Sequence, residues 1–190
     1  MKYATGSEMI SGYRREIADI RQKMRKAQAQ IEPEKVADYT FASPTGSIRL
    51  SELFGAHDDL MVVHNMGRAC PACTLWADGY SGLHAHLSSR AAFVVSSPDS
   101  PDVQQAFAGG RGWKFAMVSH QGTSFAADMG YVAENGGWRP GISVFRRQGA
   151  TIQRVSDAPL SPGDDFCALW HFFDLLPDGA AGWTPKFSYP

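Results

Sequence analysis

An apolar run that leads into a Cys-x-x-Cys motif constrains the fold of this chain more than any other stretch. Leu60 to Val63 is followed by a short Gly-containing turn and by Cys-Pro-Ala-Cys at residues 70 to 73. Apolar residues recur at helical spacing from Thr74 to Ser88. The stretch therefore predicts a strand, a loop and a dithiol at the start of a helix, where backbone N–H groups and the helix dipole favour a thiolate. Pro71 suits a first helical turn, because its missing N–H is tolerated there.

The same dithiol has a structural interpretation that the spacing leaves open. Cys167 and His171 are four residues apart near the C-terminus, so on a helix they share a face. With Cys70 and Cys73 they would supply the three thiolates and one imidazole of a structural zinc site. Cys167 stands among Phe166, Leu169 and Trp170, however, and a free cysteine in such company is usually buried. We therefore expect no metal.

Composition excludes several classes of protein. The chain has 190 residues, of which 44% are hydrophobic and 19% charged, as in one globular domain with an appendage. A net charge of -1 gives no general reason to expect nucleic acid or an anionic membrane as partner. Three cysteines are too few for a secreted disulfide scaffold, and neither a secretory signal nor a membrane-spanning run is present. These features predict a cytoplasmic protein, and we expect no bound cofactor.

The N-terminal segment from Ser7 to Ile31 predicts a long amphipathic helix that ends before Pro33. It carries seven Lys or Arg against three Asp or Glu through Ile31, a local charge of +4. The apolar stripe is narrow and resembles a helix–helix seam, which favours an arm packed on its own domain or on a second subunit in a homodimer over a membrane-surface helix. We expect an arm over residues 1–36 and one domain over residues 37–190. The stripe consists of Tyr13, Ile17, Ile20, Met24, Ala27 and Ile31.

The remaining pattern predicts an α/β domain. Strands alternate with helices in its centre, which implies parallel pairing, and hairpins flank this part on both sides. We expect a central mixed β-sheet of four or five strands flanked by helices. The predicted elements are a hairpin over 38–50, a strand over 60–64, a helix over 74–88, a strand over 91–95, a helix over 102–108, a strand over 114–119, a short helix over 124–131, a hairpin of 140–145 with 150–155, and a helix from 162 or 163 to 176.

This order of elements resembles the thioredoxin superfamily. More closely, the stretches SIRLSELFG, HNMGRACPACTLWADGY, GWKFAMVSH and PGISVFRRQG look like the bacterial thioredoxin-like family catalogued as domain of unknown function eight-nine-nine, often labelled AhpC/TSA-like. The resemblance runs from about Tyr13 to Leu176. It implies a thioredoxin-like fold and a dithiol, and leaves the substrate undefined. From the chemistry of thiol-disulfide exchange we expect a protein or small-molecule disulfide as partner.

The resemblance also assigns roles to individual residues. It implies that Cys70 attacks, that Cys73 resolves, and that Pro140, before the late hairpin, is a cis proline facing the dithiol. Peroxiredoxins place a Thr three residues before the peroxidatic Cys, whereas this chain has Gly67 there. Peroxidase activity is therefore not expected.

Four further residues are candidates for supporting the dithiol. Arg68 and His64 are expected to lower the pKa of Cys70, and His64 stands where related reductases often bury a proton-shuttling carboxylate. Trp76 is expected to pack beneath the site or simply to fill the core. Arg139, beside Pro140, is expected to meet a substrate or to be solvated. The sequence thus favours a thiol-disulfide oxidoreductase, and the alternative is a non-catalytic thioredoxin-like binding or scaffold protein whose dithiol is incidental or holds a metal.

Overall fold

A computed structural model describes all residues from 1 to 190, and the chain divides into two compact units, residues 1–33 and 34–190. The first unit contains one helix, α1 (Tyr3–Gln28), which buries none of its residues. The predicted helix is confirmed, although it begins and ends earlier than expected. It ends before Ile31 because Gln30 and Ile31 form tight turns on the carbonyls of Ala27 and Gln28. No helix of the chain is both long and apolar enough to cross a membrane.

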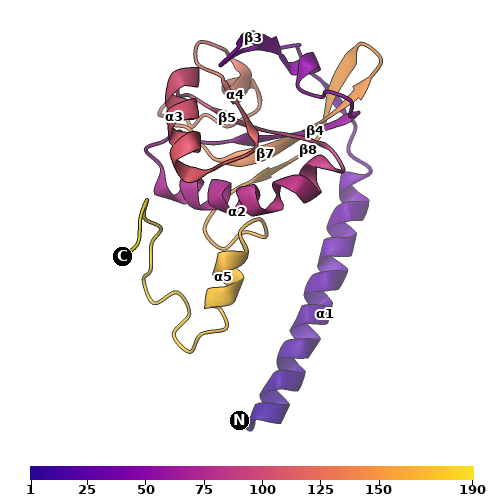
Figure 1. The fold of residues 1–190 in the computed structure, drawn as a ribbon. Helices are drawn as coiled ribbons and strands as arrows, with labels where there is room; N and C mark the ends of the chain where they lie inside the picture. The colour runs from indigo at the N-terminus through magenta and orange to yellow at the C-terminus, as the bar shows by residue number, and fades with distance from the viewer. The chain divides into compact units, whose positions relative to one another are not determined.

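The second unit is built on one mixed sheet, in the order β1-β8-β7-β4-β5-β6-β2-β3 (Figure 1). The central strands β4, β5 and β6 are parallel, and every other pair is antiparallel. The predicted α/β class is confirmed, but the sheet has eight strands because β1 and the β2–β3 hairpin extend its two edges. The strands are β1 (Glu34–Lys35), β2 (Thr40–Ser43), β3 (Gly46–Arg49), β4 (Asp59–His64), β5 (Ala92–Ser97), β6 (Ala116–Ser119), β7 (Gly141–Gln148) and β8 (Thr151–Pro159).

Two hydrophobic layers cover opposite faces of this sheet. The alternation along β4 sends Leu60 and Val62 to one layer and Val63 to the other, as the pleat requires. Helix α2 (Pro71–Ser88) packs on the Val63 face through Trp76, and it lies along the sheet in Figure 1. The opposite layer is rich in phenylalanine. The other helical segments are η1 (Leu50–Glu52), α3 (Pro101–Arg111), α4 (Phe125–Asp128) and α5 (Ala168–Phe173).

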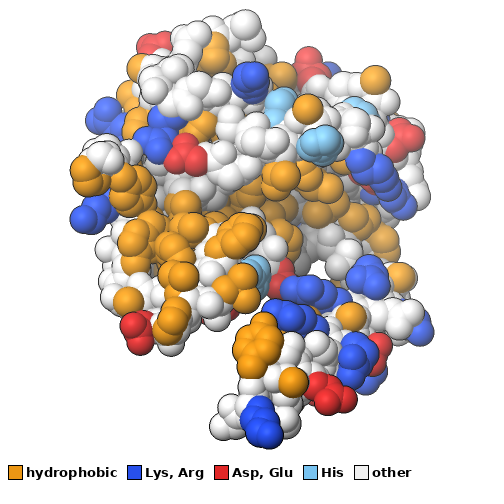
Figure 2. Space-filling view, turned by 60° about the horizontal axis from the view of Figure 1, so that its bottom comes forward, with side chains coloured by type: hydrophobic (Ala, Val, Ile, Leu, Met, Phe, Trp, Pro, Cys, Tyr) orange, Lys and Arg blue, Asp and Glu red, His pale blue; other side chains and the backbone are white.

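The prediction of a long C-terminal helix is wrong in its extent. Only Ala168–Phe173 is helical, and the side chains of Phe166 and Leu176, expected on a buried face, are 44% and 53% exposed. The reason is Asp164, whose carboxylate accepts N–H groups of Ser161 and Cys167 and so holds a turn where helix was expected. Hydrophobic side chains gather on the face that carries α5 and the C-terminal segment (Figure 2).

Candidate functional site

The dithiol caps the N-terminus of α2, directly after the loop that leaves β4. Cys70 is the residue before the first helical turn, and its Sγ accepts the backbone N–H of Cys73 at 3.0 Å. A cap of this kind satisfies a helix N–H that would otherwise lack a partner. Pro71 occupies the first helical position, as predicted from its fixed φ. Cys73 is buried, Cys70 is half-buried, and neither is in a disulfide.

The two thiols differ strongly in acidity. The hydrogen bond from the Cys73 thiol, followed by the backbone N–H groups of Cys73 and Ala72, lowers the pKa of Cys70 to about 7 against the opposing effect of burial. The same hydrogen bond and burial raise the pKa of Cys73 far above its ordinary value. The Cys73 sulfur also accepts the N–H of Met66 at 3.5 Å. The pair therefore holds one proton near neutral pH, with the thiolate on the more exposed sulfur.

The loop before the dithiol is held by two acceptors that the sequence analysis did not identify. Asn65 Oδ1 accepts the N–H of Gly67 at 2.8 Å, and Asp99 Oδ2 accepts the N–H of Arg68 at 2.7 Å. Gly67 has a φ of +97°, and a Cβ there would lie 2.9 Å from Asp99 Oδ2. Glycine is therefore required at this position. The one signal for Asp99 in the sequence was its place just after a predicted strand that runs parallel to β4.

Pro140 lies beside the dithiol, but its predicted cis peptide bond is wrong. Pro140, Cys73 and Trp76 line a small cavity of about 10 Å³. The chain contains no cis peptide bond. The backbone on either side of this trans bond is held by hydrogen bonds from Arg139 N to Tyr131 O and from Leu160 N to Pro140 O. Trp76 is buried beneath the site, and its indole N–H donates to Asp164 at 3.4 Å.

His64 does not support the dithiol as predicted. Its position on β4 sends the imidazole to the sheet face opposite α2, where it stacks on the rings of Phe125 and Tyr131 with centroid distances of 5.1 and 3.9 Å. Neither His64 nor Arg68 contributes to the lowered pKa of Cys70, which arises from hydrogen bonds to its sulfur. The side chains of Arg68 and Arg139 are both exposed. They stand next to the dithiol loop and next to Pro140, respectively.

A second histidine is buried on the same face of the sheet. His120 Nδ1 lies 2.8 Å from Ser96 Oγ, and His64 Nε2 lies 2.9 Å from Ser143 Oγ. Burial lowers the pKa of His64 to about 3 and that of His120 to about 4. Each ring keeps one nitrogen without a partner, so that both are held as neutral imidazoles.

The buried histidines predict a loss of stability in mild acid. Because their folded-state pKa values lie below the ordinary 6.5, the unfolded chain binds more protons as the pH falls from about 6.5 toward 4. Between pH 7 and pH 5 each histidine is expected to lower the free energy of unfolding by about 2 kcal/mol. Urea unfolding at both pH values measures this loss, and His120→Asn should reduce it. The exposed His86→Gln is the control, and an equal loss in all three proteins would contradict the assignment.

The four residues considered for zinc do not come together. No three His, Cys, Asp or Glu side chains of the chain are arranged to hold a metal ion. Cys167 is buried in the layer beneath α2, whereas the side chain of His171 is exposed near Asp165 and Asp174. The separation arises because α5 is short and the turn at Asp164 sets its direction.

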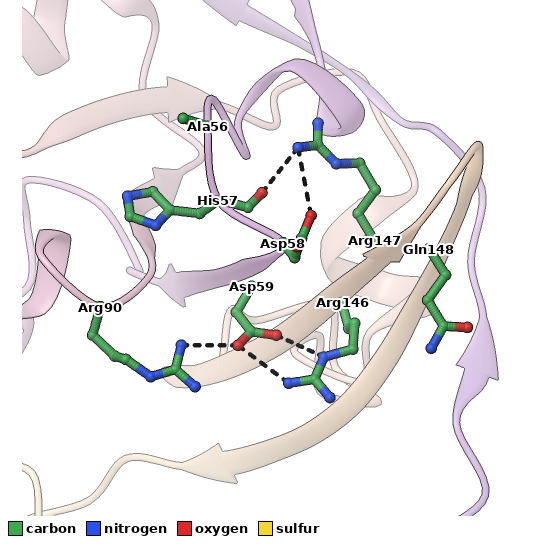
Figure 3. A pocket seen from close by; sticks show the side chains of 8 residues that line it. All are labelled: Ala56, His57, Asp58, Asp59, Arg90, Arg146, Arg147 and Gln148. Carbon is green, nitrogen blue, oxygen red and sulfur yellow. Dashed lines mark hydrogen bonds and ion pairs between the residues drawn. The ribbon is translucent and has the colours of Figure 1, made fainter.

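A cavity of about 540 Å³ lies at the other end of β4 and is lined by charged side chains (Figure 3). Asp59 accepts hydrogen bonds from Arg146 at 2.8 Å and from Arg90 at 3.0 Å, which lowers its pKa. Arg147 donates to the carbonyl groups of Gly55 and His57. Every guanidinium in this cavity is bonded to acceptors of the protein, so the cluster joins three segments and is separate from the dithiol.

Comparison with known proteins identifies the family of the chain. The sequence matches the family described as bacterial protein of unknown function (DUF899) over residues 11–186. The chain belongs to this family. The expected resemblance and its thioredoxin-like fold are thereby confirmed. No curated protein sequence matches the chain.

Several solved structures of peroxiredoxins are similar to this member of the DUF899 family. Peroxiredoxin Q of Xanthomonas campestris is 18% identical with a TM-score of 0.55, and the match covers 64% of this chain and 80% of that one. Peroxidoxin BcpB of Mycobacterium tuberculosis is 22% identical with a TM-score of 0.59, and the match covers 72% of this chain and 88% of that one. Reduced Prx3 of Vibrio vulnificus is 16% identical with a TM-score of 0.56, and the match covers 70% of this chain and 89% of that one. At such identities the likeness shows a shared thioredoxin-like fold.

Proposed function

We propose that this protein is a thiol-disulfide oxidoreductase that uses Cys70 as nucleophile and Cys73 as resolving thiol. The observation that carries the proposal is the difference in pKa between the two thiols at the helix N-terminus. The pKa of Cys70 is about 7, whereas Cys73 keeps its proton. A thiol with a pKa near the ambient pH is the best attacking group in disulfide exchange. Its partner, the thiol of Cys73, is one helical turn away and shares a side-chain hydrogen bond with it.

The reaction proceeds in two exchanges. The Cys70 thiolate attacks one sulfur of the substrate disulfide, forms a mixed disulfide, and expels the other sulfur as a thiolate that takes up a proton from water. The Cys73 thiol then loses its proton and attacks the Cys70 sulfur, which releases the second substrate thiolate and leaves a Cys70–Cys73 disulfide. The substrate gains two electrons and the protein dithiol loses them. A thiol donor, such as glutathione or a protein dithiol, returns the pair to the reduced form.

The structure offers a reason why Cys73 becomes reactive only in the second exchange. The largest effect that raises its pKa is the hydrogen bond to the Cys70 sulfur, and this effect ends once Cys70 is in a disulfide and carries no charge. The N–H of Met66, which already points to the Cys73 sulfur, then stabilises the thiolate. These contacts support the proposed order of the two steps.

Gly67 supports a disulfide rather than a peroxide as substrate. The φ of +97° is strained for any side chain, and a Cβ at this position would meet the Asp99 carboxylate at 2.9 Å, which disfavours the threonine that peroxiredoxins use there. The exposed guanidinium groups of Arg68 and Arg139 carry positive charge at the rim of the site. This charge suits a protein or small-molecule disulfide with acidic groups.

Trapping of the mixed disulfide tests the proposal. In Cys73→Ser the second exchange is blocked, so incubation with oxidised glutathione is expected to leave glutathione bound to Cys70, as measured by intact-mass spectrometry. The unmodified protein is expected to titrate against the glutathione couple as a two-electron dithiol. Cys167→Ser is the matched control and should titrate unchanged, because Cys167 lies outside the pair. The proposal would be contradicted if the dithiol of the unmodified protein did not titrate and Cys73→Ser formed no adduct with glutathione. That result would favour the binding or scaffold alternative.

A further inference from the structure

Helix α1 carries a row of large, exposed apolar side chains. The helix has 26 residues and buries none of them. A helix of this kind gains most of its stability from packing an apolar face, and a continuous exposed apolar surface marks an interaction site. The exposed fractions are 48% for Ile10, 54% for Tyr13, 47% for Ile17, 53% for Ile20 and 62% for Met24.

The spacing of the apolar residues in α1 indicates that their partner is another helix. Beginning at Ile10, apolar residues follow at alternating intervals of three and four, which is the heptad pattern of a left-handed coiled coil. Such a narrow seam fits another helix, because a helix that packs on a domain has a wider apolar face. Within the helix, positions a of the heptads are Ile10, Ile17 and Met24, and positions d are Tyr13, Ile20 and Ala27; Ile31 continues the pattern in the turn after the helix. Ile10 and Ile17 are β-branched residues at positions a, which together with Leu at d are typical of parallel two-stranded coiled coils; positions d of this helix carry Tyr, Ile and Ala instead.

The charges beside the seam favour a second copy of the same helix in parallel orientation. Glu16 is at position g and Arg21 at the following position e. In a parallel pair each Glu16 faces Arg21 of the other copy, which gives two attractive contacts by symmetry. In an antiparallel pair positions e face each other and positions g face each other, so the attraction of Glu16 for Lys23 is offset by the repulsion between Arg14 and Arg21.

We propose that α1 pairs with α1 of a second copy in a parallel two-stranded coiled coil, making the protein a homodimer. The helix is about 39 Å long at 1.5 Å per residue, which accommodates the heptads from Ile10 onward. The proposal is independent of the redox activity, since it involves no residue of the dithiol site. In this homodimer, α1 holds the thioredoxin-like domains of the two chains together.

Sedimentation equilibrium of the full chain tests the dimer. The expected mass is about 41 kDa, twice that of the 20.7 kDa chain. Ile17→Asp places a charge at the centre of the seam and should raise the dissociation constant about 100-fold or more. Gln22→Asp, on the opposite side of the helix at position f, is the control and should leave the mass unchanged. Near-UV circular dichroism checks that residues 34–190 stay folded in each variant.

Charge exchange tests the orientation. Glu16→Arg alone and Arg21→Glu alone should each weaken the dimer about tenfold, and the double variant should recover affinity because the pair is restored with opposite polarity. A monomeric wild-type chain would overturn the proposal. So would a dimer that Ile17→Asp leaves intact, since the contact would then lie elsewhere, as on the exposed apolar side chains near α5. A double variant as weak as the single ones would rule out the parallel register.

Discussion

Replacing Cys70 with serine is expected to lower disulfide reduction by roughly 10³-fold or more, because the only thiolate that the site stabilises is removed. Cys73 cannot take its place. It is buried, and its pKa is raised by burial as well as by its hydrogen bond to Cys70. The measurement is the initial rate of reduction of oxidised glutathione with an excess of a dithiol donor. Cys167→Ser, which removes a buried thiol outside the site, is expected to retain the full rate.

The pH dependence of alkylation checks the chemical reason for this loss. The rate at which iodoacetamide modifies Cys70 in the folded protein should rise with pH around a midpoint near 7, because only the thiolate reacts and the pKa of Cys70 is about 7. An ordinary cysteine has its midpoint at about 8.5. Cys73 should remain unmodified until the protein unfolds. Retention of activity by the serine variant, or a midpoint at the ordinary value, would contradict the assignment of Cys70 as nucleophile.

Replacing Gly141 with alanine is expected to cost at least ~3 kcal/mol of folding stability. A Cβ at this position would overlap the ring of Tyr131 and lie 2.7 Å from its hydroxyl oxygen. The ring cannot move aside easily. It stacks on His64 at 3.9 Å, and its hydroxyl donates to the carbonyl groups of Ile142 and Ala158. Urea unfolding followed by tryptophan fluorescence measures the change.

Two further variants separate this clash from a general effect of added methyl groups. Gly79→Ala is the matched control, because nothing lies within 4 Å of its added Cβ and alanine is the better helix former in α2. It should leave the free energy of unfolding unchanged or raise it by up to ~1 kcal/mol. In a Tyr131→Ala background, Gly141→Ala should cost much less than in the wild type. Additive costs of the two changes would show that the ring is not the obstacle.

The sequence could predict the dithiol and its setting because these depend on neighbours along the chain. A cysteine before a first helical turn, a proline in that turn and an apolar run ahead of them place Cys70 and Cys73 after β4 without reference to distant residues. The apolar periodicity of α1 is equally local. The element order was also sufficient to predict the mixed sheet, because the connections between parallel strands admit few arrangements. The family was predicted from the resemblance of four sequence stretches.

The pKa of Cys70 shows where such local reasoning fails. The charged residues nearest in sequence, His64 and Arg68, were the natural candidates for lowering it, but the pleat turns His64 to the far face of the sheet and leaves the Arg68 side chain in solvent. The lowering comes from hydrogen bonds made by Cys73 and by backbone N–H groups. Sequence spacing indicates which residues are near along the chain, and it does not give the direction of a side chain at a strand end.

By itself, the sequence determined that this chain carries a dithiol at a helix N-terminus in a thioredoxin-like domain, with an amphipathic arm before it. Only the tertiary structure showed that Asp99 holds the loop before Cys70 and excludes any side chain at Gly67, and that the bond before Pro140 is trans. The physical reason is the range of the interactions. Helix capping and apolar periodicity act within a few residues, whereas Asp99 reaches Arg68 only because β4 and β5 pair in parallel and end at the same edge of the sheet.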